Sequence, residues 1–433
     1  MSKNFMRYII FPSINQSPYY ILIFLLLVSA LRQWHTELLT SSSSISKFFQ
    51  IKPYRINFTN SQKNYLRREN DLLAIESNQN FIEDSITILR WTKFFGENFE
   101  SEDLQCDDLK QKCIVSNDRS ISDHIDAIVF HAPDIKWSDL PPHRQSTQYY
   151  VFFAWESPYH TRNQLNKEWK KSYFNLTMTY RQDSSNFAPY GRVIGRRSPL
   201  RSDLRDLIKN KARPIAWLVS NCHTPSKREL LVVAIRRYMP VDIFGKCGRY
   251  KCMKDTSEQS DNPKKCGHII EQKYKFYLAF ENSLCKDYVT EKFFRRIQRY
   301  VVPIVLERQN YMNLCPEYKK PWFIAVDDFR NLEDLIKYLL YLDSNNTAYY
   351  EYLRWHEDYE TVVHVNSDTR AMSQDHWCGL CRTVAKKEKR ILKDIDSWWN
   401  QQVCNLGAKM CLRSDLVITV LICWTWFNCG IAS

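Results

Sequence analysis

Two cations of this chain stand at the predicted start of a helix, shortly after an apolar run. Arg228 follows the run Ile215–Val219 and the polar loop 220–226, and Lys292 follows the run Phe276–Phe280 and its loop. In parallel α/β sheets, ligands bind beyond the carboxyl ends of the strands, where helix N-termini also point. Either cation alone is typical of a solvated surface. Two of them at equivalent places in successive strand–helix units favour a ligand-binding site, in which a lysine can contact a phosphate.

The loops beside these cations carry polar side chains for the rest of a ligand. Ser226 and Glu229 have the spacing of a capping box, which predicts Ser226 as the N-cap of the helix that carries Arg228. The second loop and helix start add an amide, a phenol and a carboxylate that can bind ribose or sugar hydroxyls: Asn282, Tyr288 and Glu291.

Glu156 follows the apolar run Tyr149–Ala154 in the first half of the chain. A carboxylate at the end of a buried strand can reach a cleft and take the proton of an attacking hydroxyl group. On these residues alone, the preferred interpretation is a turn glutamate before Ser157-Pro158.

Strands must alternate with helices to bring these residues together. Apolar runs separated by helical or polar stretches predict two parallel α/β halves that face each other across a cleft, joined by a linker over residues 192–211. The predicted strands are Ile86–Leu89, Ala127–Phe130, Tyr149–Ala154, Ile215–Val219, Val241–Phe244, Phe276–Phe280 and Val301–Leu306, with helices over about Ser226–Arg237 and up to about Arg299.

The chain has 433 residues, 61 Lys and Arg against 48 Asp and Glu, a net charge of +13, and 14 Cys. Excess positive charge favours a nucleic-acid partner, but the basic residues are spread along the chain and no nucleic-acid-binding module is recognisable. Many cysteines indicate an oxidising compartment. We therefore expect no nucleic-acid partner.

Residues 18–31 form an apolar run flanked by Lys3, Arg7 and Arg32. Its length lies between that of a signal-peptide core and the roughly 20 residues of a full membrane span. We expect an uncleaved anchor with a cytosolic N-terminus, and a cleaved signal peptide stays as the alternative. Both place the body of the protein in the secretory lumen, in agreement with three glycosylation sequons at Asn57, Asn175 and Asn345.

Cys378 and Cys381 form the one Cys-x-x-Cys pair of the chain, and Cys247, Cys252 and Cys266 with His268 form a second candidate zinc set. Structural zinc usually needs two such paired knuckles, so disulfides are the preferred interpretation, with their partners left open. The one Asp-x-Asp motif, Asp394–Asp396, lies in a basic stretch that is predicted helical, and we interpret it as surface charge rather than a metal site. His131 and His160 stay open between substrate contact and a core or surface role.

The segments Tyr274–Ser283 and Asp287–Lys292 resemble the donor-binding signature of the α-1,3-fucosyltransferases. The resemblance extends in order from about Ile86 to Arg382. Further similar segments are Asp118–Ser120, Ala127–His131, Trp155–Pro158, Phe174–Arg181, Pro189–Gly191, Trp217–Asn221, Val241–Gly245 and Trp377–Arg382. The last of these resembles the C-terminal cysteine pair of the family, which makes Cys378 and Cys381 disulfide candidates.

This resemblance implies a Golgi type II membrane enzyme with a GT-B arrangement of two Rossmann-like domains. It implies transfer of fucose, with inversion, from GDP-β-L-fucose to the 3-hydroxyl of GlcNAc in a glycoprotein or oligosaccharide acceptor. Arg228 and Lys292 would hold the diphosphate, and Glu156 would be the base. Asn282, Tyr288 and Glu291 would contact the pyrophosphate, the ribose or the fucose.

The implied organisation divides the chain into six parts. These are a cytosolic tail (1–17), a signal anchor (18–31), a stem (32–80), an acceptor-side domain (81–195), a GDP-fucose-binding domain (212–365) and a Cys-containing extension (366–433). The apolar segment 416–427 within the extension has no functional interpretation. We expect no dedicated metal site; divalent cations would stimulate the reaction only by screening the diphosphate.

Two alternatives to a fucosyltransferase stay open. One is a catalytically impaired homologue that binds glycan or a GDP-sugar, although the presence of Glu156, Arg228 and Lys292 argues against it. The other is a GT-B transferase for another nucleotide sugar. The sequence does not distinguish an acceptor at the core GlcNAc from a Lewis-type acceptor on an outer arm.

Overall fold

The computed structural model describes residues 85–404, with gaps at 98–100, 122–124, 137, 162–171, 201–202, 254–262, 316, 365–373, 389 and 401–403. Every described residue belongs to one compact unit, which lies within residues 81–433. The predicted anchor, the stem, Asn57 and segment 416–427 lie outside the described residues. Within that part of the chain, no helix is both long and apolar enough to cross a membrane.

The first half forms a seven-stranded sheet of order β2-β3-β1-β4-β5-β6-β7. All neighbouring strands are parallel except the β2–β3 pair. The predicted strands lie within β1, β4 and β5, so these predictions are confirmed. The strand bounds are β1 Ser85–Arg90, β2 Glu102–Leu104, β3 Lys112–Ser116, β4 Ala127–His131, β5 Tyr149–Ala154, β6 Leu176–Thr179 and β7 Asn186–Phe187.

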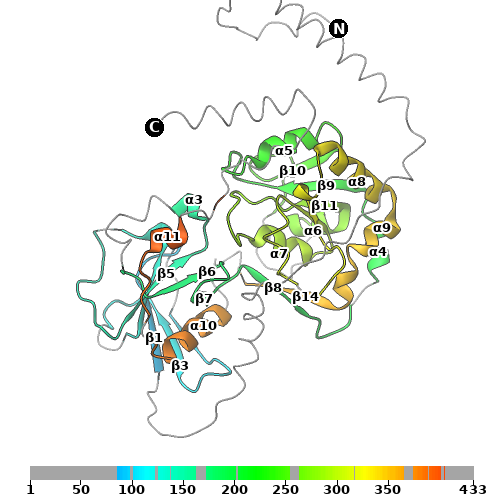
Figure 1. Cartoon of the computed structure of the whole chain (residues 1–433). Coiled ribbons are helices and arrows are strands. Elements are labelled where there is room, and N and C mark those ends of the chain that lie inside the picture. Colours follow the sequence, from blue (N-terminus) through cyan, green and yellow to red (C-terminus); the bar gives the residue numbers. More distant parts are fainter. Residues whose placement is uncertain are drawn as a thin grey trace, which may run out of the picture. The chain divides into compact units, whose positions relative to one another are not determined.

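The second half forms a five-stranded parallel sheet of order β10-β9-β11-β12-β13. Its strands are β9 Arg213–Leu218, β10 Val241–Phe244, β11 Tyr274–Leu278, β12 Val302–Val305 and β13 Ile324–Ala325. Helices α5 to α9 surround it (Figure 1). Their bounds are α5 Arg228–Ile235, α6 Cys266–Lys273, α7 Glu291–Ile297, α8 Leu332–Ser344 and α9 Asn346–Glu351.

This strand order places a topological switch point between β9 and β11. From β9 the chain crosses to β10 on one side, and from β10 it returns to β11 on the other side. The loops that leave β9 and β11 therefore lead away from each other, and such a switch point is where open α/β sheets bind their ligands.

Residues 192–211, predicted as a linker, contain most of β8 (Gly191–Gly195) and all of α4 (Leu204–Lys209). β8 pairs antiparallel with β14 (Tyr359–Val363) in a separate two-stranded sheet. The stretch lacks a long apolar run because only part of each of these short elements is buried.

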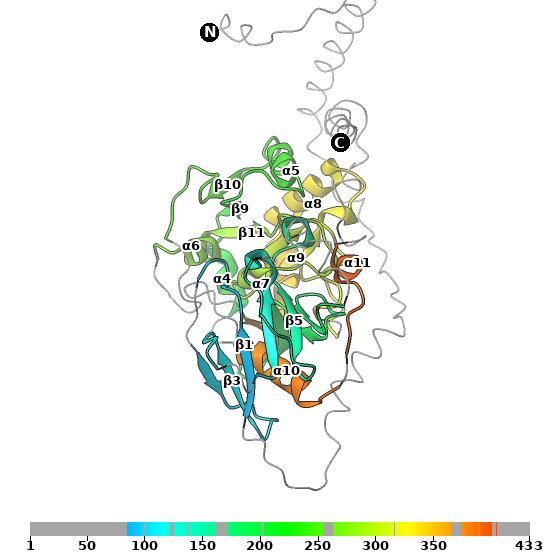
Figure 2. The same ribbon diagram turned by 90° about the vertical axis from the view of Figure 1, so that its left-hand side faces the viewer.

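The C-terminal segment returns to the first sheet as α10 (Gln374–Ala385) and α11 (Ile395–Trp399), drawn in orange and red beside the strands of the first half (Figures 1 and 2). Trp399 packs on Phe152 of β5, with ring centroids 5.3 Å apart, and donates a hydrogen bond to Thr161. Disulfides fasten α10 to the strands: Cys106–Cys378 and Cys113–Cys381.

Candidate active site

Arg228 and Lys292 both lie beside the switch point of the second sheet. Arg228 is the first residue of α5, after the loop that leaves β9. Lys292 is the second residue of α7, after the loop that leaves β11. The positive charge of Arg228 acts on Lys292 and works to lower its pKa. The structure therefore brings together the two cations that the sequence predicted to share a site.

Arg228 is buried and is held by backbone carbonyl groups. Its Nη1 donates to the carbonyl of Phe280 and its Nη2 donates to that of Asn221 at 3.3 Å. Burial lowers the pKa of Arg228, and the carboxylate of Glu281 opposes that shift. The guanidinium thus joins the ends of β9 and β11 in addition to any role toward a ligand.

Two polar atoms of this site are buried without a hydrogen-bond partner in the part of the chain that the structure describes. They are Nε of Arg228, a donor, and Oδ1 of Asn282, an acceptor. Burial of an unsatisfied polar group costs free energy, so such atoms usually face a ligand or a water molecule. A phosphate oxygen could accept from Nε of Arg228, and a hydroxyl group could donate to Oδ1 of Asn282.

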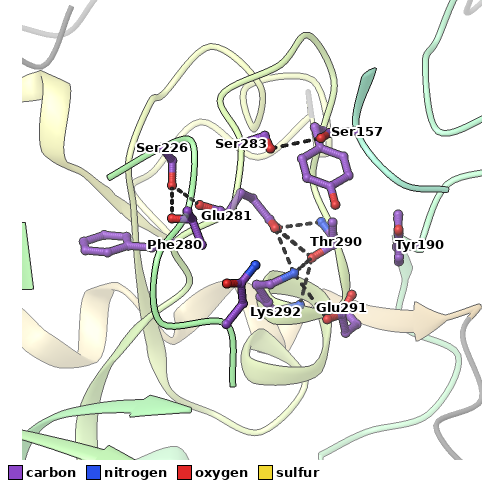
Figure 3. A network of polar contacts seen from close by, with 12 residues as sticks. Ser157, Tyr190, Ser226, Phe280, Glu281, Ser283, Thr290, Glu291 and Lys292 are labelled. Atoms are coloured by element: carbon purple, nitrogen blue, oxygen red, sulfur yellow. Dashed lines mark hydrogen bonds and ion pairs between the residues drawn. The ribbon is translucent and has the colours of Figure 1, made fainter. Parts of the chain in front are cut away.

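Lys292 belongs to an ionic network around the buried carboxylate of Glu281, and Lys292 itself is partly exposed (Figure 3). The carboxylate of Glu281 accepts bonds from the backbone N–H of Thr290 at 2.8 Å and from its hydroxyl at 2.8 Å. Nζ of Lys292 lies 3.1 Å from Glu281, 2.8 Å from Oγ1 of Thr290 and 3.3 Å from Glu291. These contacts orient the ammonium group at the start of α7.

Burial raises the pKa of Glu281, although Lys292 pulls it down. Burial also acts to raise the pKa of Glu291, but the cations of Lys292 and Arg295 outweigh it and lower that pKa. Burial disfavours the cation of Lys292, but Glu281 and Glu291 outweigh this effect and raise its pKa. Lys292 is therefore charged throughout the neutral range.

The first half contributes the segment Trp155–Ser157, which follows β5. The hydroxyl group of Ser157 donates to that of Ser283 in the second half at 2.9 Å, and both residues are buried. Oε2 of Glu156 accepts a bond from the phenol of Tyr288 at 3.4 Å. Glu156 therefore contacts the loop between β11 and α7 directly. The sequence resemblance implied a ligand contact for Tyr288 and did not predict this contact with Glu156.

The predicted capping box is wrong. Lys227, in the left-handed region with φ 52°, is the N-cap of α5 and makes no side-chain capping bond. Ser226 instead donates to the backbone carbonyl of Glu281 at 2.7 Å, and Glu229 accepts from Thr224. A buried carbonyl on the neighbouring loop competes successfully for the Ser226 hydroxyl, and sequence spacing contains no information on that partner.

The network around Lys292 contains residues to which the sequence gave no individual role. Glu281, Ser283 and Thr290 lie inside the segments that resemble a donor signature, and that resemblance was the only signal available for them. Tyr190, whose hydroxyl donates to the carbonyl of Trp155, lay in a further similar segment.

The other candidate residues lie in varied surroundings. His131 is buried and bonded to Asp134 at 2.6 Å, and burial lowers its pKa; His160 is exposed.

The side-chain amide of Asn175 accepts from the backbone N–H of Tyr150 and donates to the carbonyl of Arg390, so an attached glycan would compete for its nitrogen. Asn345 is the N-cap of α9.

The cysteines of both candidate zinc sets form disulfides. Besides the bridges of α10, the described residues contain Cys222–Cys247, Cys252–Cys266 and Cys285–Cys404. Among the described residues, no group of three or more His, Cys, Asp or Glu side chains could hold a metal ion. Asp394 is the N-cap of α11 and accepts from the backbone of Asp396 and Ser397.

Two family models match this chain. "Fucosyltransferase, N-terminal" matches residues 83–191, and "Glycosyltransferase family 10 (fucosyltransferase) C-term" matches residues 208–398. Together they span more than half of the 433 residues.

Named relatives agree with these matches. Alpha-(1,3)-fucosyltransferase C of Drosophila melanogaster is 31% identical over 369 residues, which cover 77% of this chain and 81% of the relative. The 4-galactosyl-N-acetylglucosaminide 3-alpha-L-fucosyltransferase 9 of Rattus norvegicus is 30% identical over 346 residues, covering 78% and 86%. A crystal structure of an alpha1,3-fucosyltransferase with GDP is 14% identical, covers 74% of this chain and 96% of that chain, and has a TM-score of 0.42. On the family models and the sequence relatives, the chain belongs to glycosyltransferase family 10, as an enzyme of the α-1,3-fucosyltransferase type.

Proposed function

We propose that this protein is an inverting glycosyltransferase that moves L-fucose from GDP-β-L-fucose to the 3-hydroxyl of a GlcNAc in a glycoprotein or oligosaccharide glycan. One observation carries the proposal: a carboxylate of the first half, Glu156, touches the loop of the second half that leads to Lys292. A base and a cationic leaving-group site at one junction are what direct transfer to a hydroxyl requires.

Inversion follows from a single in-line displacement. The 3-hydroxyl oxygen of the acceptor attacks C1 of fucose on the face opposite GDP, and its proton passes to the carboxylate of Glu156. The bond from C1 to the β-phosphate oxygen breaks, and its electron pair leaves with GDP. Arg228 and Lys292 stabilise the charge that develops on the diphosphate. Asn282 and Glu291 contact the ribose or fucose hydroxyl groups.

The wider organisation is part of the same proposal. The two α/β halves form a GT-B arrangement, with an acceptor-side domain over 81–195 and a donor domain over 212–365. Residues 18–31 anchor the protein in the Golgi membrane as a type II protein with a lumenal catalytic body, carrying glycans at its sequons. Stimulation by divalent cations stays a prediction.

The direct test incubates the full-length, detergent-solubilised chain with GDP-fucose and a panel of acceptors. The panel contains N-glycans with a free core GlcNAc, lactosamine oligosaccharides and a control lacking GlcNAc. We expect fucose on the 3-hydroxyl of GlcNAc, with the α anomer in the product, by NMR. Tight binding of GDP-fucose without turnover on any acceptor would favour the impaired homologue. Turnover only with another nucleotide sugar would favour a different transferase.

Arg228→Ala should weaken GDP affinity by about 10-fold or more, because a charged hydrogen bond contributes about 1.5–3 kcal/mol. It should also lower Tm, because the carbonyl groups of Phe280 and Asn221 lose their donors. Calorimetric titration with GDP measures the first effect. Arg236→Ala, at the exposed C-cap of the same helix, is the matched control. GDP affinity equal to that of the unaltered protein would contradict a diphosphate role for Arg228.

A further inference from the structure

Three hydroxyl groups hold three successive residues of the first half in place. Tyr190 donates to the carbonyl of Trp155, Tyr288 donates to the carboxylate of Glu156, and Ser157 is bonded to Ser283. Figure 3 shows Ser157 beside Ser283, with Tyr190 on the same side of the network. Two of the three partners, Ser283 and Tyr288, lie on the loop that leaves β11 and leads to α7.

Tyr288 is rigidly placed. It is 2% exposed, and its ring packs 4.9 Å from that of Tyr180 and 6.5 Å from that of Tyr190, measured between centroids. Its backbone N–H donates to the carbonyl of Cys285, which forms a disulfide with Cys404. A phenol fixed by its ring and by its backbone can keep its hydroxyl group directed at one acceptor.

The loop before Tyr288 is fixed as well. Asp287 adopts φ 59° and its backbone N–H donates to Asn310 at 3.0 Å. Its carboxylate accepts from the backbone N–H of Gln182 in the first half at 3.1 Å. A salt bridge of 3.1 Å between Lys286 and Asp183 joins the same two loops.

Tyr288 is a neutral donor at every working pH. Burial raises its pKa well above the ordinary value of a phenol, and the charge of Glu156 raises it further. The proton of this hydrogen bond therefore belongs to Tyr288, and Oε2 of Glu156 accepts it.

We propose that Tyr288 is a positioning residue for the base Glu156, and that it acts together with Ser283. The inference rests on the proposed function, because it needs Glu156 as the base. Tyr288 occupies Oε2 and so directs Oε1 toward the acceptor hydroxyl, which gives its proton to Oε1 as the new bond to C1 forms. The donor-binding loop thereby sets the orientation of the base. This role differs from the donor contact that the sequence resemblance implied for Tyr288.

Tyr288→Phe removes the hydroxyl group and keeps the ring. At saturating GDP-fucose and acceptor, we expect kcat of the full chain to fall about 10-fold, with the Kd for GDP unchanged within two-fold. The KM values for GDP-fucose and for the acceptor should stay within about two-fold, so that the loss falls on kcat alone.

Tyr180→Phe is the matched control. Tyr180 is as buried as Tyr288 and packs against it, yet within the described residues its hydroxyl group has no hydrogen-bond partner. Its removal should leave kcat, both KM values and GDP affinity unchanged. The same loss of kcat in this control as in Tyr288→Phe would assign the effect to packing and overturn the proposal.

Three other results would also overturn it. They are an unchanged kcat in Tyr288→Phe, a loss of GDP affinity with full kcat at saturation, and a loss of kcat accompanied by an equally large rise in KM. Ser283→Ala is the second variant should Tyr288→Phe not fold; it should lower kcat several-fold without changing the Kd for GDP. Glu156→Gln distinguishes a failure of the positioning role of Tyr288 from a failure of the base assignment on which it rests. If it abolishes transfer while Tyr288→Phe has no effect, only the positioning role fails, and if it transfers fully, the base assignment itself fails.

Discussion

Glu156→Gln should reduce kcat by about 10²- to 10⁴-fold, the usual contribution of a general base. Glutamine keeps the size of the side chain and can still accept the bond from Tyr288, but its amide cannot take up the proton of the acceptor hydroxyl. GDP affinity should change little, because Arg228 and Lys292 belong to the second half. Steady-state kinetics with saturating donor and acceptor, together with calorimetric titration of GDP, give the two quantities.

Glu360→Gln is the control for this substitution. Glu360 is a partly buried carboxylate of β14 that pairs with Arg196 at 3.5 Å. Its replacement should leave kcat unchanged. Undiminished transfer by Glu156→Gln would eliminate Glu156 as the base, and a loss of GDP affinity would assign it to donor binding instead.

The sequence predicted most accurately the strands that are marked by a local apolar run. β5 and β10 have the bounds expected from their apolar runs, because both strands are almost entirely buried, and β5 ends at Ala154 while Gly245 follows β10. β3 was missed, because Lys112 and Cys113 interrupt its short apolar pattern. The disulfide partners of Cys378 and Cys381 lie about 270 residues away, and only the folded topology brings them near.

The candidate site likewise contains residues that a local pattern could predict and long-range contacts that it could not. The two cations could be found because each helix start follows its own strand, which makes their position a local property of the chain. The bond from Tyr288 to Glu156 joins residues 132 positions apart, and that from Ser157 to Ser283 joins residues 126 apart. Such contacts depend on how the two halves meet, so the sequence resemblance could group these residues but could not pair them.

Lys292→Ala should have the largest effect on the donor site. Glu281 is 3% exposed, and removal of one partner from a buried ion pair costs about 3–5 kcal/mol of unfolding free energy. GDP-fucose affinity should fall by about 10- to 150-fold as the charged contact to the diphosphate is lost. Thermal or urea unfolding and donor titration measure the two effects. Lys273→Ala, at the exposed end of α6, controls for the loss of a lysine as such.

The destabilisation of Lys292→Ala should depend on pH. Burial already raises the pKa of Glu281, and the loss of Lys292 removes the main influence that lowers it. When the pKa of a carboxyl group is higher in the folded than in the unfolded protein, the free energy of unfolding falls as the pH rises through the folded pKa. It recovers as the pH falls toward the unfolded pKa of about 4.3. The variant should therefore approach the stability of the unaltered protein near pH 5 and differ most near pH 8. Equal destabilisation at both values would contradict the pairing with Glu281.

Addition of Glu281→Gln to Lys292→Ala separates the structural role of Lys292 from its role in binding. The glutamine can still accept the bonds from the backbone and hydroxyl group of Thr290, but it leaves no buried charge without a partner. The double variant should recover most of the stability at pH 8 and lose its pH dependence. Donor affinity should stay low, because no cation has been restored to the diphosphate. Recovery of GDP-fucose affinity together with stability would mean that Lys292 only supports the fold, and that Arg228 alone neutralises the leaving group.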